Sequence, residues 1–204
     1  MDHFLYRDGC LHAEDVAISQ IAAEVGTPFY LYSSATLLRH FKLFDDALAG
    51  MDHLICYAMK AASNQAILTL LGAAGAGMDV VSGGEYARAR AAGIPGDRIV
   101  FSGVGKTRAE MTEVLTGGVR QFNVESEPEM RALSGVASTL SKTAPITIRD
   151  NPEEDAKTHA KISPGKKEDK YSIPISRARE VYDIEDRMPE PEVVGIDLHL
   201  DSQH

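Results

Sequence analysis

Short apolar runs alternate with longer segments rich in Ala and Leu from Leu54 onward. Each run has the length of one buried strand, and each segment between two runs has room for a helix. The predicted strands are Leu54–Met59, Met78–Val81, Arg98–Phe101, Gln121–Val124, Ile146–Arg149 and Val193–Leu200. The predicted helices are Asn64–Ala74 with Ser63 as its N-cap, Gly84–Ala92, Arg108–Leu115, Glu127–Ala137 and Ser176–Arg187. This alternation indicates an α/β fold with a parallel sheet.

The first 50 residues follow a different pattern. They predict strands over Phe4–Leu11 and Thr27–Tyr32, with a helix over Glu14–Glu24 between them, and a helix over Ala35–Leu48 that leads into the alternating region. A polar, irregular stretch over Asp150–Lys170 predicts a long loop. The alternation alone leaves two architectures open, an open doubly wound sheet or a (β/α)8 barrel.

Composition narrows the class of protein. The chain has 204 residues, of which 44% are hydrophobic and 25% charged, as in ordinary globular proteins. Its net charge of -9 argues against nucleic acid as the main partner, because phosphate binding needs clustered Lys and Arg. Cys10 and Cys56 form no CxxC pair, which fits a reducing cytoplasm better than a disulfide framework. No signal peptide and no membrane-spanning run is predicted, so we expect a cytoplasmic protein with no membrane partner.

Lys60 is the first candidate for chemistry, because it follows the first strand of the alternating region. Ligands of parallel α/β folds bind at the carboxyl ends of strands. Cys56, Ala58 and Lys60 share one face of that strand, and the small Ala58 leaves room beside the amine. Such a lysine can act as an amine nucleophile. The ordinary alternative, a solvated lysine at a strand end, is the more common state of a lone lysine.

Two other candidate sites are weaker. Gly103–Thr107 suggests a phosphate-binding P-loop, but that motif needs a glycine at position 100, which is Val100. A tight turn between strand and helix is the better interpretation. His159 and Asp155 suggest metal ligands, yet no second His or carboxylate follows at ligand spacing. We therefore expect no metal site.

Several segments, in order along the chain, resemble motifs of one enzyme family. They are Tyr57–Ala61 around the lysine, Gly77–Glu85, Asn123–Ser126, Ile148–Pro152, Thr158–Lys170 and His199–Gln203. Together they resemble the pyridoxal phosphate (PLP) dependent decarboxylases of the alanine racemase fold. The Gln at the end of the last segment and the Thr-His pair favour the diaminopimelate decarboxylase branch over the ornithine and arginine decarboxylases.

The resemblance implies a fold and a set of site residues. Residues 34–204 would form part of a (β/α)8 barrel of the alanine racemase class, and residues 1–33 would belong to a separate β-domain. Lys60 would be the catalytic residue that holds PLP. Asp79, Arg149, His199 and Ser202 would also bind the cofactor. Without the resemblance, the two acids Asp79 and Glu85 are ordinary strand-end and helix-start acids, His199 is a core or loop histidine, and Arg149 is a solvated charge.

The reaction implied by the resemblance is decarboxylation of meso-2,6-diaminopimelate to L-lysine, with a small amino acid as substrate. A homodimer is implied for the complete protein. Two alternatives stay open. One is another decarboxylase of the same fold, acting on ornithine, arginine or carboxynorspermidine. The other is a PLP-binding barrel protein without catalytic activity.

The sequence departs from the family pattern after Arg149. Asp150, Pro164, Ser172 and Asp201 replace an expected apolar residue, Thr, Gly and Gly. If Arg149 faces the barrel interior, alternation places Asp150 against the surrounding helices, where an unpaired carboxylate is costly. The chain ends after the sixth predicted strand, so the resemblance covers the N-terminal half of the family. This implies a fragment or a truncated member with two exposed sheet edges and no activity of its own.

Overall fold

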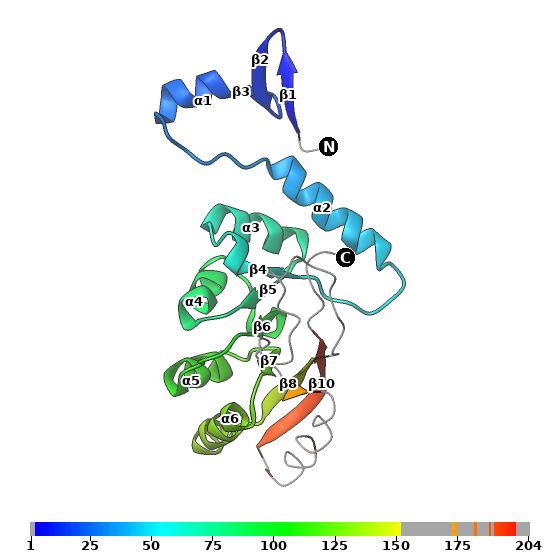
Figure 1. Cartoon of the computed structure of the whole chain (residues 1–204), viewed down its shortest axis with the longest axis vertical. Coiled ribbons are helices and arrows are strands. Elements are labelled where there is room, and N and C mark those ends of the chain that lie inside the picture. The colour runs from blue at the N-terminus through cyan, green and yellow to red at the C-terminus, as the bar shows by residue number, and fades with distance from the viewer. Residues whose placement is uncertain (1–2, 152–172, 175–181, 183–187, 189, 199–204) are drawn as a thin grey trace.

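A parallel sheet organises the larger part of the molecule, below the N-terminal segment in the view of Figure 1. The computed structural model describes residues 3–151, 173–174, 182, 188 and 190–198. The strands of this sheet, in chain order, are β4 (Cys56–Ala58), β5 (Gly77–Val80), β6 (Ile99–Phe101), β7 (Gln121–Val124), β8 (Ala144–Asn151) and β10 (Pro191–Leu198). The short β9 (Ile173–Pro174) pairs with the end of β8. All six predicted strands are therefore confirmed, with ends that shift by up to two residues within the described part of the chain.

Strand order decides between the two predicted architectures. Within the described residues, and leaving aside the short β9, each strand pairs with the next along the chain, from β4 at one edge to β10 at the other. The helices α3 (Gln65–Ala74), α4 (Gly83–Ala91), α5 (Arg108–Thr116) and α6 (Glu127–Leu140) all lie on the same side of the sheet (Figure 1). A doubly wound sheet would have helices on both faces and a reversal of strand order. The fold is therefore a partial (β/α)8 barrel.

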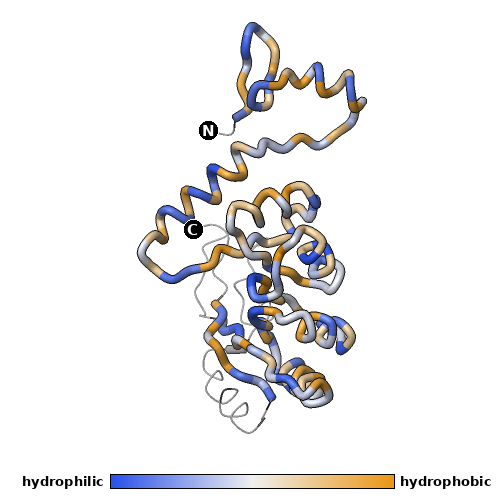
Figure 2. The backbone as a smooth tube through the Cα atoms, turned by 180° about the vertical axis from the view of Figure 1, so that it is seen from behind, coloured by the Kyte–Doolittle hydropathy of each residue, from blue (hydrophilic) through white to orange (hydrophobic). Residues whose placement is uncertain are grey.

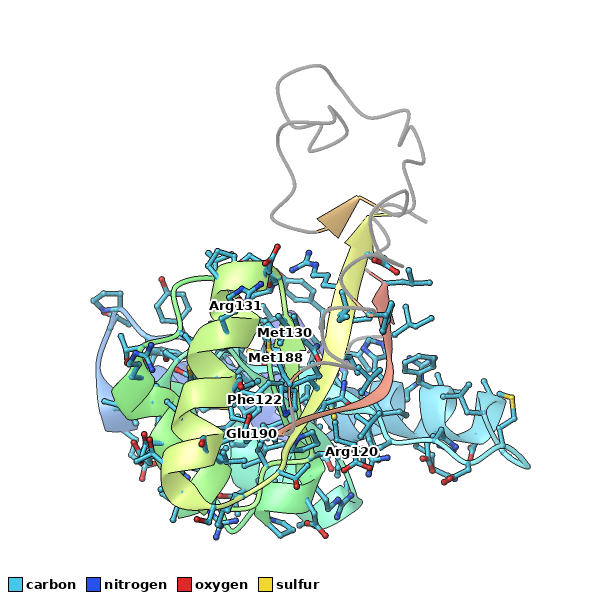
Figure 3. The ribbon with its side chains drawn as sticks, turned by 90° about the horizontal axis from the view of Figure 1, so that it is seen from below. Arg120, Phe122, Met130, Arg131, Met188 and Glu190 are labelled. Carbon is cyan, nitrogen blue, oxygen red and sulfur yellow. The ribbon has the colours of Figure 1, made fainter. Side chains whose placement is uncertain are left out.

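The hydrophobic core lies between the sheet and these helices. Alternate strand residues enter it, among them Met78, Phe101, Phe122 and Ile146, all of which are fully buried. Figure 3 shows Phe122 of β7, Met130 of α6 and Met188 in this layer. Polar N-caps begin the helices because their side chains accept from free backbone N–H groups. The cap of α3 is Asn64, so the prediction of Ser63 as cap was wrong; the Asn64 amide oxygen accepts from the N–H of Ala66.

One irregularity in the sheet sets the faces of its last strand. The pairing of β10 with β8 shifts between Val193 and Gly195, so one extra residue is accommodated there. After the shift, Asp197 lies opposite Arg149 and Leu198 lies opposite Asp150. Strand neighbours in register share a face, so Asp197 and Arg149 point to the same side of the sheet.

The N-terminal segment corrects three predictions. Phe4–Leu11 is not one strand but the hairpin of β1 (Phe4–Arg7) and β2 (Cys10–Ala13), because Asp8 and Gly9 adopt φ values of 50° and 77° in a two-residue turn. The helix predicted from Glu14 begins later, after β3 (Val16–Ala17), as α1 (Ile18–Val25). The predicted strand Thr27–Tyr32 pairs with no described strand and links α1 to α2 (Ser34–Ala47). In Figure 2, hydrophilic and hydrophobic stretches alternate along α2.

Glu14 joins this N-terminal segment to the start of α2. Its Oε1 accepts from the hydroxyls of Ser33 and Ser34, at 2.8 and 3.0 Å, and from the backbone N–H of Ala35 at 2.9 Å. His3 adds a hydrogen bond to Thr36, with 2.9 Å between Nδ1 and Oγ1. A carboxylate at a helix N-terminus is stabilising because it meets free N–H groups and the positive end of the helix dipole.

Glu14→Ala is expected to loosen this joint, and Glu14→Gln to loosen it less, because an amide oxygen still accepts. The hydrogen bonds from Ala35, Ser33 and Ser34 lower the pKa of Glu14 below 4.5, its ordinary value. The contact is therefore at full strength above pH 4.5 and is lost as the pH falls through the lowered pKa. Hydrogen–deuterium exchange of the Ala35 amide measures this. Equal protection in wild type and Glu14→Ala at neutral pH would contradict the assignment.

Candidate active site

The face of the sheet opposite the core is lined by polar side chains. Asp79, Ser102, Asn123, Thr147 and Arg149 occupy strand or strand-end positions that alternate with core residues. Pairing in register brings them side by side, with Asn123 opposite Thr147. These side chains therefore form one polar layer near the carboxyl ends of the strands, where ligands of parallel folds bind.

Lys60 lies directly beyond this layer, in the short 3-10 helix Met59–Ala61 that follows β4. Met59 is fully buried and anchors the turn, whereas Lys60 is exposed. The Tyr57 hydroxyl donates to the carbonyl of Ala62 at 3.2 Å and fixes the far end of the turn. None of the hydrogen bonds or ion pairs among the described residues uses the Lys60 ammonium. The amine is therefore held at the strand end and is available to a ligand.

Asp79 is a carboxylate on the neighbouring strand that interacts electrostatically with this amine. Ala58, two residues before Lys60, is its partner in register. Burial raises the pKa of Asp79, against a 2.6 Å hydrogen bond from the Ser102 hydroxyl and the charge of Lys60, which both lower it. The structure thus brings two of the predicted site residues, Lys60 and Asp79, within electrostatic range of each other.

Arg149 is tied down by a carboxylate that the sequence analysis did not single out. Its Nη1 lies 2.9 Å from Oε1 of Glu125, whose side chain is only 2% exposed. The same oxygen accepts from the backbone N–H of Gly103 at 3.0 Å. Asp197 lies opposite Arg149; burial raises the pKa of this carboxyl, and the Arg149 charge opposes that rise. Arg149 therefore balances two acids of the polar layer and is not a solvated strand-end charge.

Lys106 stabilises the glycine-rich turn after β6. Its ammonium is 1% exposed and donates to Glu129 at 2.6 Å and to the carbonyl of Asn123 at 2.9 Å. A third bond goes to the carbonyl of Gly103 at 2.5 Å. All three donors of the ammonium are thus used within the protein. Lys106 holds a turn in place and offers nothing to a phosphate, in agreement with the rejection of a P-loop.

The other residues singled out in the sequence analysis are placed as follows. His199 and Ser202 lie outside the described residues, as do Pro164, Ser172 and Asp201. Glu85 caps its own helix region, because its Oε2 accepts from the backbone N–H of Val81 at 2.8 Å. Asp150 lies on the core side, as alternation predicted. Glu125 and Asp197 were missed. Alternation along β7 would have placed Glu125 on the face of Asn123, whereas Asp197 reaches the polar face only through the register shift in β10.

A cavity of about 410 Å³ lies elsewhere, along the edge strand β4 beneath α2. It is lined by Leu37, His40, Phe41, Phe44, Ile55, Cys56, Tyr57, Ala58, Leu71 and Ala76. Burial and the Asp79 charge raise the pKa of the Cys56 thiol to about 11, so this cysteine is a poor nucleophile. The apolar lining does not suit an anionic cofactor. Among the described residues, no three His, Cys, Asp or Glu side chains gather to hold a metal ion, and no helix is long and apolar enough to cross a membrane.

The polar layer fits a cofactor that carries an aldehyde and binds a lysine. Such a group needs an accessible amine that is not tied up in an ion pair, and Lys60 provides one, with Asp79 and the Arg149–Glu125 pair on the same face of the sheet. Lys106, the other lysine near the strand ends, is excluded by its burial and its three partners. Lys60 is therefore the residue of this layer that can hold the cofactor covalently.

Comparison with known proteins identifies the family of the chain. Residues 34–204 match the model of the family described as pyridoxal-dependent decarboxylase, pyridoxal binding domain. The diaminopimelate decarboxylase of Pseudomonas fluorescens is 50% identical over 204 residues, which are 100% of this chain and 49% of that protein. The enzyme of the same name from Vibrio cholerae is 48% identical, with the same coverage. The chain spans about half the length of the curated relatives it matches.

Solved structures agree in fold. Diaminopimelate decarboxylase from M. jannaschii in complex with L-lysine superimposes with a TM-score of 0.89 at 31% identity, over 100% of this chain and 49% of that one. The Helicobacter pylori enzyme in complex with L-lysine gives a TM-score of 0.85 at 40% identity, over 91% of this chain and 47% of that one. With its partial barrel, its strand-end lysine and these matches, the chain belongs to the family of pyridoxal-dependent decarboxylases.

Proposed function

We propose that this chain supplies the PLP-binding part of an enzyme that decarboxylates meso-2,6-diaminopimelate to L-lysine. The observation that carries the proposal is the exposed amine of Lys60, placed at a strand end within electrostatic range of Asp79. The matched relatives named diaminopimelate decarboxylase support the choice of substrate. When bound, PLP supplies an electron sink for the bond that breaks at the substrate α-carbon.

The residues of the chain would do the rest. Lys60 would hold the cofactor through its amine, and Asp79 would keep a negative charge near that nitrogen. Arg149, balanced by Glu125, would add a fixed positive charge on the same face. His199 and Ser202 would complete the cofactor site, in the roles that the family resemblance gives them. In this proposal residues 1–33 belong with a β-domain, and residues 34–204 form the PLP-binding barrel.

We also propose a cytoplasmic homodimer for the complete protein. The free thiol of Cys10 is exposed, which suits a reducing compartment. Large apolar side chains of the N-terminal region are exposed as well, among them Tyr6, Val25, Tyr30 and Phe44. Exposed apolar surface of this kind is typical of a protein–protein interface. The mass of the intact protein in solution tests the dimer.

Lys60 is expected to be the residue labelled when the intact protein is incubated with PLP and reduced with borohydride. Peptide mapping should place the pyridoxyl group on Lys60, and Lys60→Ala should lose both the label and the release of carbon dioxide from diaminopimelate. Lys106→Ala is unsuitable as a control because Lys106 is buried; Lys42→Ala, at an exposed ion pair, is the matched one. A label on Lys106 or Lys170 would overturn the assignment. Label without carbon dioxide release from any substrate of a panel with ornithine, arginine and carboxynorspermidine would leave a binding protein.

A further inference from the structure

Asp79 ends a chain of hydrogen bonds that crosses four neighbouring strands. The Ser102 hydroxyl donates to Oδ1 of Asp79 at 2.6 Å, and Nδ2 of Asn123 donates to Oγ of Ser102 at 3.0 Å. Oδ1 of Asn123 accepts in turn from the Thr147 hydroxyl at 2.8 Å and from Nε2 of Gln121 at 2.8 Å. Asn123 and Thr147 are 8% and 3% exposed, so these bonds are shielded from water.

Every donor in this chain points toward Asp79. Thr147 and Gln121 both donate to the amide oxygen of Asn123, which leaves the amide nitrogen to face Ser102. Because Ser102 already accepts from that nitrogen, its own hydrogen is directed to Asp79. A carboxylate that accepts such a bond is favoured in its ionised form, and shared direction along a chain strengthens each bond.

The charges around Asp79 make this direction important. Lys60 and Arg149 lower the pKa of Asp79, whereas Glu85 raises it, and burial raises it most. Asp197 and Cys56 also lie within electrostatic range of Asp79. The two cations thus share the polar layer with Asp79, Glu125 and Asp197, and an ionised Asp79 is opposed by both burial and neighbouring acids.

We propose that Ser102 and Asn123 are positioning residues whose one-directional hydrogen bonds keep Asp79 an anion beside Lys60. The proposal deepens the function assigned above and rests on the placement of Lys60 and Asp79 in the cofactor site. In this proposal both residues act through Asp79. Asn123 has the more specific role, because an amide can both accept from Thr147 and donate to Ser102, whereas a carboxylate at this position could only accept.

The test is a carboxyl titration of Asp79 by NMR in the intact, cofactor-free protein with labelled aspartate side chains. The Asp79 signal is assigned by its absence in Asp79→Asn. Ser102→Ala removes the donor and should raise the pKa of Asp79 by about one unit. Asn123→Asp should raise it at least as much, because Ser102 would then donate to the new carboxylate. Ser102→Thr keeps the hydroxyl and should restore the wild-type titration, and an unchanged Asp97 signal reports an intact fold.

The outcomes separate this inference from the proposed function. An Asp79 titration that is the same in wild type, Ser102→Ala and Asn123→Asp would overturn the relay. If the titration shifts as expected but PLP does not label Lys60, the relay stands and the assignment of the cofactor site falls. A purely structural role for Ser102 predicts lower stability without a shift in the pKa of Asp79, and Ser102→Thr separates that case.

Discussion

Replacing Lys106 by methionine is expected to lower the free energy of unfolding by about 3 to 5 kcal/mol, the usual cost of breaking a buried ion pair. Glu129 would keep its charge in the core without a counter-ion, and the carbonyls of Gly103 and Asn123 would each lose a donor. Burial already raises the pKa of Glu129 even with Lys106 present, so the charged carboxylate would be destabilised further once its counter-ion is lost. Urea unfolding of wild type and variant measures the loss.

A second substitution makes this prediction specific. Glu129→Gln in the Lys106→Met background removes the unpaired charge, and its amide can donate to the vacated carbonyls, so most of the lost stability should return. The matched control is Arg131→Met, on α6, the helix that carries Glu129. Its ion pair with Glu127 is exposed, 58% at the arginine, and should contribute less than about 1 kcal/mol. A loss at Lys106 no larger than at Arg131 would show that the buried pair is not a structural link.

Asp150→Val is expected to raise the free energy of unfolding at neutral pH by about 2 to 4 kcal/mol. Asp150 is 5% exposed on the core side of β8, and its Oδ1 has no hydrogen-bond partner among the described residues. Burial raises the pKa of this carboxyl, and its charge contributes to the raised pKa of the Tyr182 hydroxyl. Valine would fill the position without a polar atom.

The pH dependence identifies the cause. Because the folded-state pKa of Asp150 lies above the unfolded value of 3.8, the folded protein binds the proton more readily. The penalty is therefore complete above the raised pKa and disappears as the pH falls below 3.8. The advantage of Asp150→Val over wild type should shrink accordingly in unfolding curves at successively lower pH. Asp150→Asn should gain only part of it, and a gain for Asp150→Val that is independent of pH would point to packing instead of charge.

The strands of the parallel sheet could be predicted from the sequence because each carries its own apolar core face, whereas the choice of a barrel came from the family resemblance. Phe122 and Val124, for example, alternate with polar residues inside a run short enough for one strand. The N-terminal segment could not be predicted in the same way, since its helices α1 and α2 bury no residue completely. There the Asp8–Gly9 turn, and not hydrophobicity, decides where the chain reverses.

Candidate site residues could be named from the sequence where one side chain suggests the chemistry, and they were missed where the role depends on a pair of residues. Lys60 could be found from its place after an apolar strand. Glu125 and Asp197 belong to the site because each interacts with Arg149 on a neighbouring strand. The register between strands, which brings them together, is not visible in one sequence. The same holds for Ser102 and Asn123, whose types are common at strand ends.

The extra residue in β10 gives this register a consequence beyond the local bend. If the two strands kept the register set by Val193 and Ile146, with Val194 opposite Thr147, Asp197 would lie beside Asp150 instead of Arg149. The carboxylates of Asp150 and Asp197 would then both lie on the core side of the sheet, while Ile196 would enter the polar layer. In β10 the register shift at Val194, as much as the identity of the side chains, therefore determines which groups reach the polar layer.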